Sequence, residues 1–250
     1  MKKKYNLVIT HSFPTNSIIL KGLVDFLSEY FNVYFIDLPG FRNLVTPLKQ
    51  ISIDGYAEYM EKEIRKINLD KYILGSMSFS HCVVSKMKVD ECCKSVIAIE
   101  PFINKKVFKI KKYKLIYYQL LTNIIKRLNI YDYIWKKNYL GIFLKFADKE
   151  VLEVIINEID PKTFIDTANI IFSFSGEYWL NKPYILIMNK NDNKISYKEV
   201  TSLFKKNVDD LLIVDTDIKH FPDDMSLNYF KQQLNSRSIN SIFKWLEKRY

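Results

Sequence analysis

The sequence predicts an α/β protein with a mostly parallel sheet of about six strands and helices on both faces. In the first hundred residues, short apolar runs alternate with longer segments of helical periodicity, a pattern typical of parallel strands joined by crossover helices. Two further apolar runs, at 184–188 and 211–215, extend the sheet. Residues 102–180 show helical spacing without a strand signal, which predicts a helical insertion.

The predicted strands are apolar runs bounded by turn residues, at 5–10, 33–37, 71–75, 95–100, 184–188 and 211–215. The predicted helices carry apolar residues three and four positions apart, at 18–30, 53–67, 81–88, 115–128, 149–159, 163–174 and 238–249. We therefore divide the chain into an α/β core, residues 1–101 and 181–250, and a helical lid, residues 102–180.

Composition narrows the class of protein. Hydrophobic residues make up 48% of the 250 and charged residues 26%, which is usual for a globular domain. No apolar run approaches the ~18 residues of a membrane span, and the basic N-terminus lacks the apolar length of a signal peptide. The three cysteines, Cys82, Cys92 and Cys93, have no metal-ligand spacing. We expect a cytoplasmic protein with no metal site.

The net charge of +10 raises the question of a nucleic-acid partner. An abundance of Lys, Asn, Ile, Tyr and Phe, as an A/T-rich genome produces, explains the charge more simply, so we expect no nucleic-acid partner. One basic cluster is dense and contains no acid: Lys105, Lys106, Lys109, Lys111, Lys112 and Lys114. It could be a solvated helix face or a docking surface for an acidic partner.

The segment Ser76-Met77-Ser78-Phe79-Ser80 follows the third predicted strand and has the pattern small-x-Ser-x-small. A nucleophilic serine on a strand-to-helix elbow needs small flanking residues, because the turn is sharp. The usual flanking residue is glycine, and this chain has serine at both places. Taken alone, the segment fits an inert serine-rich turn better than a nucleophile elbow.

A serine nucleophile needs a base, and the base needs an orienting acid. His220 follows the last predicted strand and Asp192 follows the strand at 184–188, so both are expected at the carboxyl edge of the sheet. Asp215 and Asp217 are alternative acids. His81 lies too close to Ser78 along the chain for its ring to reach back to the hydroxyl.

Four motifs in this order resemble the α/β-hydrolase superfamily, especially its lid-bearing, esterase-like serine hydrolases. His11-Ser12-Phe13-Pro14 resembles the His-Gly-x-Pro turn, and the segment from Asp37 to Phe41 resembles the Asp-x-Pro-Gly-x segment. The elbow at Ser78, and the loops of Asp192 and His220, resemble the family's nucleophile, acid and histidine positions.

The resemblance implies an α/β-hydrolase fold and a catalytic triad of Ser78 as nucleophile, His220 as base and Asp192 as its orienting acid. The backbone N–H groups of Phe13 and Phe79 would form the oxyanion hole, and His11 would be a structural residue. Neither a metal nor an organic cofactor is implied. An Asp nucleophile, which epoxide hydrolases and dehalogenases of the superfamily use, is excluded by Ser78.

Departures from the family pattern keep alternatives open. Ser12 replaces a glycine in the first turn, and Gly75 lies one position before the expected elbow glycine. A register with Met77 as the elbow residue is rejected, because Phe79 would then fill a position for small residues. Beside a hydrolase of small-molecule acyl esters, we consider an acyltransferase or thioesterase served by an acidic acyl carrier protein, and a non-catalytic binding protein.

Overall fold

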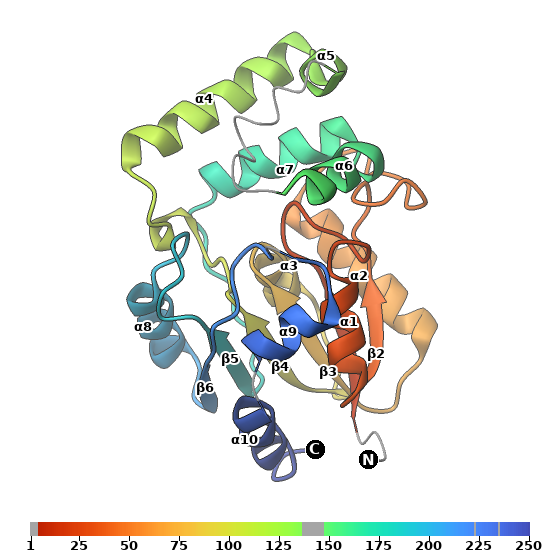
Figure 1. Ribbon diagram of the computed structural model, residues 1–250, viewed down its shortest axis with the longest axis vertical. Helices are drawn as coiled ribbons and strands as arrows, with labels where there is room; N and C mark the ends of the chain where they lie inside the picture. Colours follow the sequence, from red (N-terminus) through yellow and green to blue (C-terminus); the bar gives the residue numbers. More distant parts are fainter. Residues whose placement is uncertain (1–4, 137–147, 223, 235) are drawn as a thin grey trace.

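The computed structural model describes residues 5–136, 148–222, 224–234 and 236–250. Its six-stranded sheet is parallel throughout and has the order β2-β1-β3-β4-β5-β6 (Figure 1). The strands are β1 (Asn6–Thr10), β2 (Asn32–Ile36), β3 (Tyr72–Met77), β4 (Cys93–Ile99), β5 (Tyr184–Met188) and β6 (Leu211–Asp215). The predicted six-stranded parallel sheet is confirmed.

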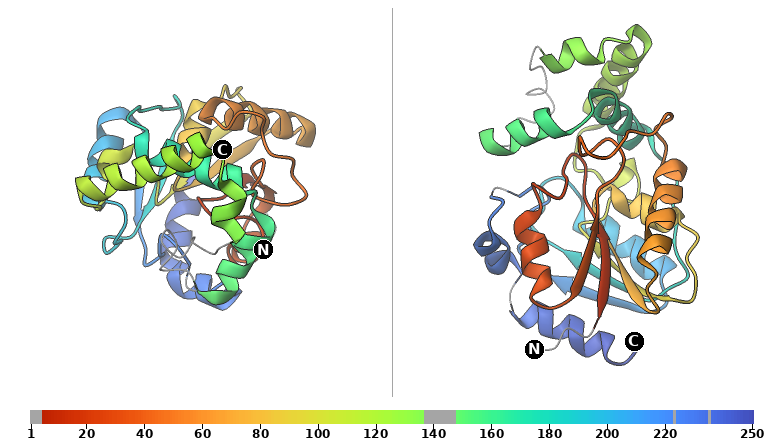
Figure 2. Two further views of the ribbon diagram at one scale, coloured as in Figure 1. Left: turned by 90° about the horizontal axis from the view of Figure 1, so that it is seen from above. Right: turned by 90° about the vertical axis from the view of Figure 1, so that its right-hand side faces the viewer.

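Helices cover both faces of this sheet, because successive strand side chains point to opposite sides. On β1, Leu7 and Ile9 belong to one apolar cluster and Val8 to the other. The first cluster packs against α1 (Lys21–Ser28), α9 (Leu227–Gln233) and α10 (Ser236–Leu246); the second packs against α2 (Ile53–Ile67), α3 (Ser80–Lys86) and α8 (Tyr197–Asn207). Figure 2 (right) shows the resulting three layers.

The insertion lies at one end of the molecule, above the carboxyl edge of the sheet (Figure 1). It contains the 3-10 helix η1 (Lys105–Val107) and helices α4 (Lys112–Leu128), α5 (Tyr131–Lys136), α6 (Lys149–Glu158) and α7 (Pro161–Ser173). Both α4 and α5 pack on α7. These positions suit the predicted lid, whose exact division from the core stays a prediction. Over the described ranges, every helix is too short or too polar to span a bilayer.

Several element boundaries differ from the predicted ones. The helix expected at 18–30 starts at Lys21, because the side chain of Asn16 accepts hydrogen bonds from the N–H groups of Ile18 and Ile19 and holds a turn there. Strand β3 continues two residues past Gly75, since pairing with β4 persists to Met77. The sequence prediction also lacks α5, α8 and α9.

Candidate active site

Ser78 occupies a tight turn between β3 and α3, with φ at +51°. Its N–H donates to the carbonyl of Ile99 at 3.0 Å, and its own carbonyl accepts from the N–H groups of His81 and Phe102. A non-glycine residue in the left-handed region costs free energy and persists where the surroundings enforce it, often at functional sites. Three backbone hydrogen bonds supply that enforcement here.

The two serines that replace the usual elbow glycines are completely buried. The hydroxyl of Ser80 accepts from the Met77 N–H at 2.8 Å and donates to the Met77 carbonyl at 3.0 Å. The hydroxyl of Ser76 lies 3.4 Å from the carbonyl of Ile97. The elbow thus forms with serine at both flanking positions, and Met77 is the last residue of β3, while Ser78 stands at the turn.

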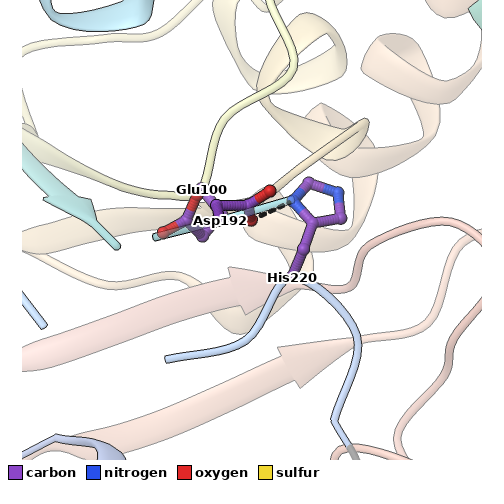
Figure 3. Close-up of side chains that lie close together, drawn as sticks. All are labelled: Glu100, Asp192 and His220. Carbon is purple, nitrogen blue, oxygen red and sulfur yellow. Dashed lines mark ion pairs between the residues drawn. The ribbon is translucent and has the colours of Figure 1, made fainter. Parts of the chain in front are cut away.

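The structure brings together the three side chains that the sequence singles out. Ser78 Oγ lies 2.8 Å from His220 Nε2. On the other side of the imidazole, His220 Nδ1 lies 3.3 Å from Asp192 Oδ2, an ion-pair distance without hydrogen-bond alignment (Figure 3).

Asp192 is buried in the loop after β5, and its Oδ1 accepts hydrogen bonds from the N–H groups of Lys194 and Ile195. Burial alone would raise the pKa of this carboxyl. The adjacent His220 and the two N–H donors outweigh burial and lower the pKa to about 2. The alternative acid Asp215 is engaged elsewhere, because it pairs with Lys190 at 2.6 Å and accepts from Tyr197 at 2.7 Å.

Glu100 is a second carboxyl at this site, which the sequence prediction does not include. It follows β4 directly, is fully buried and has φ at +43°. One oxygen accepts from the N–H of Asn189, while the other has no partner among the described residues. Burial, with the nearby charge of Asp192, raises the pKa of Glu100 to about 9. This shift favours the protonated carboxyl at neutral pH.

Within the described ranges, Glu100, Asp192 and His220 form one set of three potential metal ligands, with atoms within 4.8 Å of one another (Figure 3). Two features of the donor set suit proton sharing better than a cation. The Nε2 atom of His220 faces Ser78, and one oxygen of Asp192 is taken up by backbone N–H groups. We therefore interpret the set as an acid–acid–base arrangement.

The other two histidines have structural positions. The imidazole of His11 is buried, accepts from the Leu38 N–H at 2.9 Å and lies 2.9 Å from the Ser12 carbonyl, so it joins the loops after β1 and β2. His81 is buried between hydroxyl groups, with Nδ1 3.4 Å from Ser76 and Nε2 3.3 Å from Ser85. Burial lowers the pKa of His81 to about 3.

A cavity with a volume of about 520 Å³ opens beside Ser78. Both predicted oxyanion residues, Phe13 and Phe79, line it together with Ser78 and His220. The remaining lining is mostly apolar and includes Phe102 and Phe108 before α4, Tyr113 and Tyr118 of α4, Ile171 and Phe172 of α7, and Phe221. Four lysines also contribute: Lys109, Lys111, Lys114 and Lys194.

The backbone N–H groups of Phe13 and Phe79 have no protein acceptor recorded among the described residues, which leaves them available as donors. Phe79 immediately follows Ser78 at the start of α3, and Phe13 lies in the loop after β1. Both residues line the same cavity as Ser78. Their role in holding an oxyanion stays a prediction.

No family model and no curated protein matches the sequence. Solved structures do match in three dimensions. An epoxide hydrolase from Bacillus megaterium has a TM-score of 0.70 at 13% identity, covering 98% of this chain and 94% of that one. An esterase from Thermogutta terrifontis gives 0.69 at 14%, covering 98% and 90%. An esterase from Exiguobacterium antarcticum gives 0.66 at 12%, covering 98% and 93%. The TM-scores establish a shared fold, and at identities this low the likeness extends to the fold alone.

Proposed function

We propose that this chain, which has the α/β-hydrolase fold, is a serine hydrolase that cleaves a carboxylic ester or thioester through an acyl-enzyme on Ser78. One observation carries the proposal: Ser78 Oγ stands 2.8 Å from His220 Nε2 on an elbow with positive φ. The same distance argues against a non-catalytic binding protein, for which no serine–histidine contact is needed.

In the first half-reaction, Ser78 Oγ attacks the acyl carbonyl carbon while His220 Nε2 takes the hydroxyl proton. The carbonyl oxygen becomes an oxyanion, which the N–H groups of Phe13 and Phe79 stabilise. The tetrahedral intermediate collapses, and His220 returns the proton to the departing alcohol or thiol. The ionised Asp192 stabilises the imidazolium that exists between these two transfers.

In the second half-reaction, His220 removes a proton from water, and the resulting nucleophile attacks the acyl carbon of the ester on Ser78. A second oxyanion forms in the same hole and collapses to the carboxylic acid, and Ser78 regains its proton from His220. Comparable solved structures include an epoxide hydrolase. A serine at the elbow favours acyl transfer over the Asp-nucleophile chemistry that the resemblance attributes to such enzymes.

The lining of the cavity indicates the kind of acyl group that the substrate would carry. Its aromatic and aliphatic lining suits an apolar acyl group of a small-molecule ester. Lys109, Lys111, Lys114 and Lys194 in the lining also favour a second candidate, an acyltransferase or thioesterase that accepts acyl chains from an acidic carrier protein. Charge reversal at Lys112, which adjoins this group without lining the cavity, should raise the KM for carrier-bound substrate only if that candidate is correct.

The proposed function is tested with a fluorophosphonate probe and a series of p-nitrophenyl esters of increasing acyl length. The protein should be labelled and should hydrolyse at least one ester, and Ser78→Ala should abolish both. Ser85→Ala is a matched control, because Ser85 is a buried serine of α3 outside the cavity lining. Absence of labelling, or labelling that survives Ser78→Ala, would overturn the proposal.

A further inference from the structure

Helix α4 carries a row of exposed apolar side chains. Eight large apolar side chains of the described residues are strongly exposed, and six of them belong to this helix. Ile116, Leu120, Ile124 and Leu128 follow one another at intervals of four, with Tyr113 and Tyr117 beside them. Residues four apart share one face of a helix. We call these six residues the α4 row; each is between 48% and 62% exposed.

The α4 row faces away from the body of the protein. The buried residues of α4 are Thr122 and Ile125, and the helix packs on α7. Thr122 donates to Asn169 of α7, which fixes the inward side. Figure 1 shows α4 at the end of the molecule farthest from α10, and Figure 2 (left) looks down on it. Together these side chains form a larger apolar surface than scattered exposed residues do, and such surfaces mark binding sites.

The charged residues along the sequence around the α4 row are all positive. Residues 102–131 contain eight lysines and arginines and no Asp or Glu: Lys105, Lys106, Lys109, Lys111, Lys112, Lys114, Lys126 and Arg127. Two have acceptors, since Lys126 pairs with Asp166 and Lys109 donates to the carbonyl of Asp192. Lys111, Lys112 and Lys114 are exposed at the start of the helix.

We propose that the α4 row docks on an anionic lipid surface, with the helix lying in the plane of the headgroups. A helix with an apolar face and flanking cations is the type that binds such an interface, the apolar side chains entering the acyl boundary while the cations meet anionic headgroups. An acidic carrier protein would match the lysines and leave the apolar row in water. A second copy of this chain would bring two sets of cations together.

Docking of the α4 row would also place the cavity at the lipid surface. Tyr113, the first residue of the row, and Lys114 beside it both line the cavity that reaches Ser78. A substrate dissolved in the lipid layer would then reach the serine without crossing bulk water. This consequence rests on the proposed hydrolase function, whereas the docking itself does not.

The test is co-sedimentation of the full chain with vesicles of phosphatidylcholine alone and of phosphatidylcholine mixed with an equal amount of phosphatidylglycerol. Binding is expected to the mixed vesicles and to weaken in high salt. The double variant Leu120→Asp, Ile124→Asp should lower the partition coefficient by about tenfold or more, because two apolar anchors become charged. Both side chains are more than half exposed, so folding is expected to survive.

Leu44→Asp is the matched control, because Leu44 is 83% exposed but lies in the loop after β2. It should leave vesicle binding unchanged. Absence of binding to the mixed vesicles, or equal losses in Leu44→Asp and the double variant, overturns the proposal. So does a dimer in light scattering that the double variant dissociates, or binding to an acidic carrier protein with none to vesicles. Ser78→Ala should still bind vesicles, so a failure of the hydrolase proposal would be seen separately.

Discussion

Glu100 and Asp192 bring two carboxyl groups within 4.8 Å of each other behind the His220 imidazole (Figure 3). Their environments separate their pKa values, because Glu100 is buried beside the charge of Asp192, while Asp192 has His220 and two N–H donors. A proton on Glu100 gives the pair a donor and an acceptor in place of two facing charges. We therefore propose Glu100 as a positioning residue for the acid of the proposed triad.

Replacing Glu100 with Gln should preserve activity near neutral pH. The amide keeps the size and the neutral charge of the protonated acid, and it can still accept from the Asn189 N–H and donate toward Asp192. We expect kcat/KM of an active ester to change less than about threefold. Glu58→Gln, on the exposed side of α2, is the control. A loss as large as that of Asp192→Asn would contradict the positioning role.

The pH dependence of stability should reveal the raised pKa of Glu100. The folded value is about 9 and the ordinary value 4.5, so between them the folded state binds a proton that the unfolded state has released. The contribution to stability is thus complete below 4.5 and is lost as the pH rises toward 9, by up to about 1.4 kcal/mol per pH unit. Denaturant unfolding from pH 5 to 9 should show a decline in the free energy of unfolding that Glu100→Gln removes. Equal declines in the two proteins would exclude a raised pKa of Glu100.

Asp192→Asn should lower kcat by about 10³-fold or more, because His220 loses the charge that stabilises its protonated form. The further change Glu100→Gln should add little to that loss. A much slower double variant would mean that Glu100 serves as a second acid once Asp192 is neutral. Fluorophosphonate labelling rates give the comparison directly, without a need for the natural substrate.

Gly22→Ala should destabilise the core without touching the candidate site. A β-carbon at Gly22 would lie 2.3 Å from the carbonyl oxygen of Met225 and 2.5 Å from the backbone of Ser226, which cannot rotate away. We expect a loss of about 1–3 kcal/mol in the free energy of unfolding, typical of overpacking. Lys21→Ala, at an exposed neighbouring position, should change it by less than about 0.5 kcal/mol. Thermal unfolding distinguishes the two.

The sequence was informative about the sheet because buried parallel strands leave continuous apolar runs, and the runs at 184–188 and 211–215 coincide with β5 and β6. It was less informative where tertiary contacts decide. The seven residues of α9 pack on α1 and carry little periodicity of their own. The start of α4 at Lys112 has no side-chain cap to mark it.

Glu100 illustrates the same limit at the candidate site. Its position at the end of a predicted strand already placed it at the carboxyl edge, where Ser78, Asp192 and His220 were expected. What the sequence could not supply was the order of the strands, which makes β4 and β5 neighbours and so brings Glu100 next to the loop of Asp192. A carboxyl at the end of a strand indicates a functional site more strongly once the neighbouring strands are known.

Backbone hydrogen bonds join the insertion to the core at its beginning and near α7, and they limit how the insertion could move. The Lys109 N–H donates to the Lys194 carbonyl, and the Ser196 N–H donates to the carbonyl of Val107 at the end of η1. Near α7, the Asp160 N–H donates to the Gly40 carbonyl. Movement of the insertion at its beginning would therefore also displace the loop that holds Asp192.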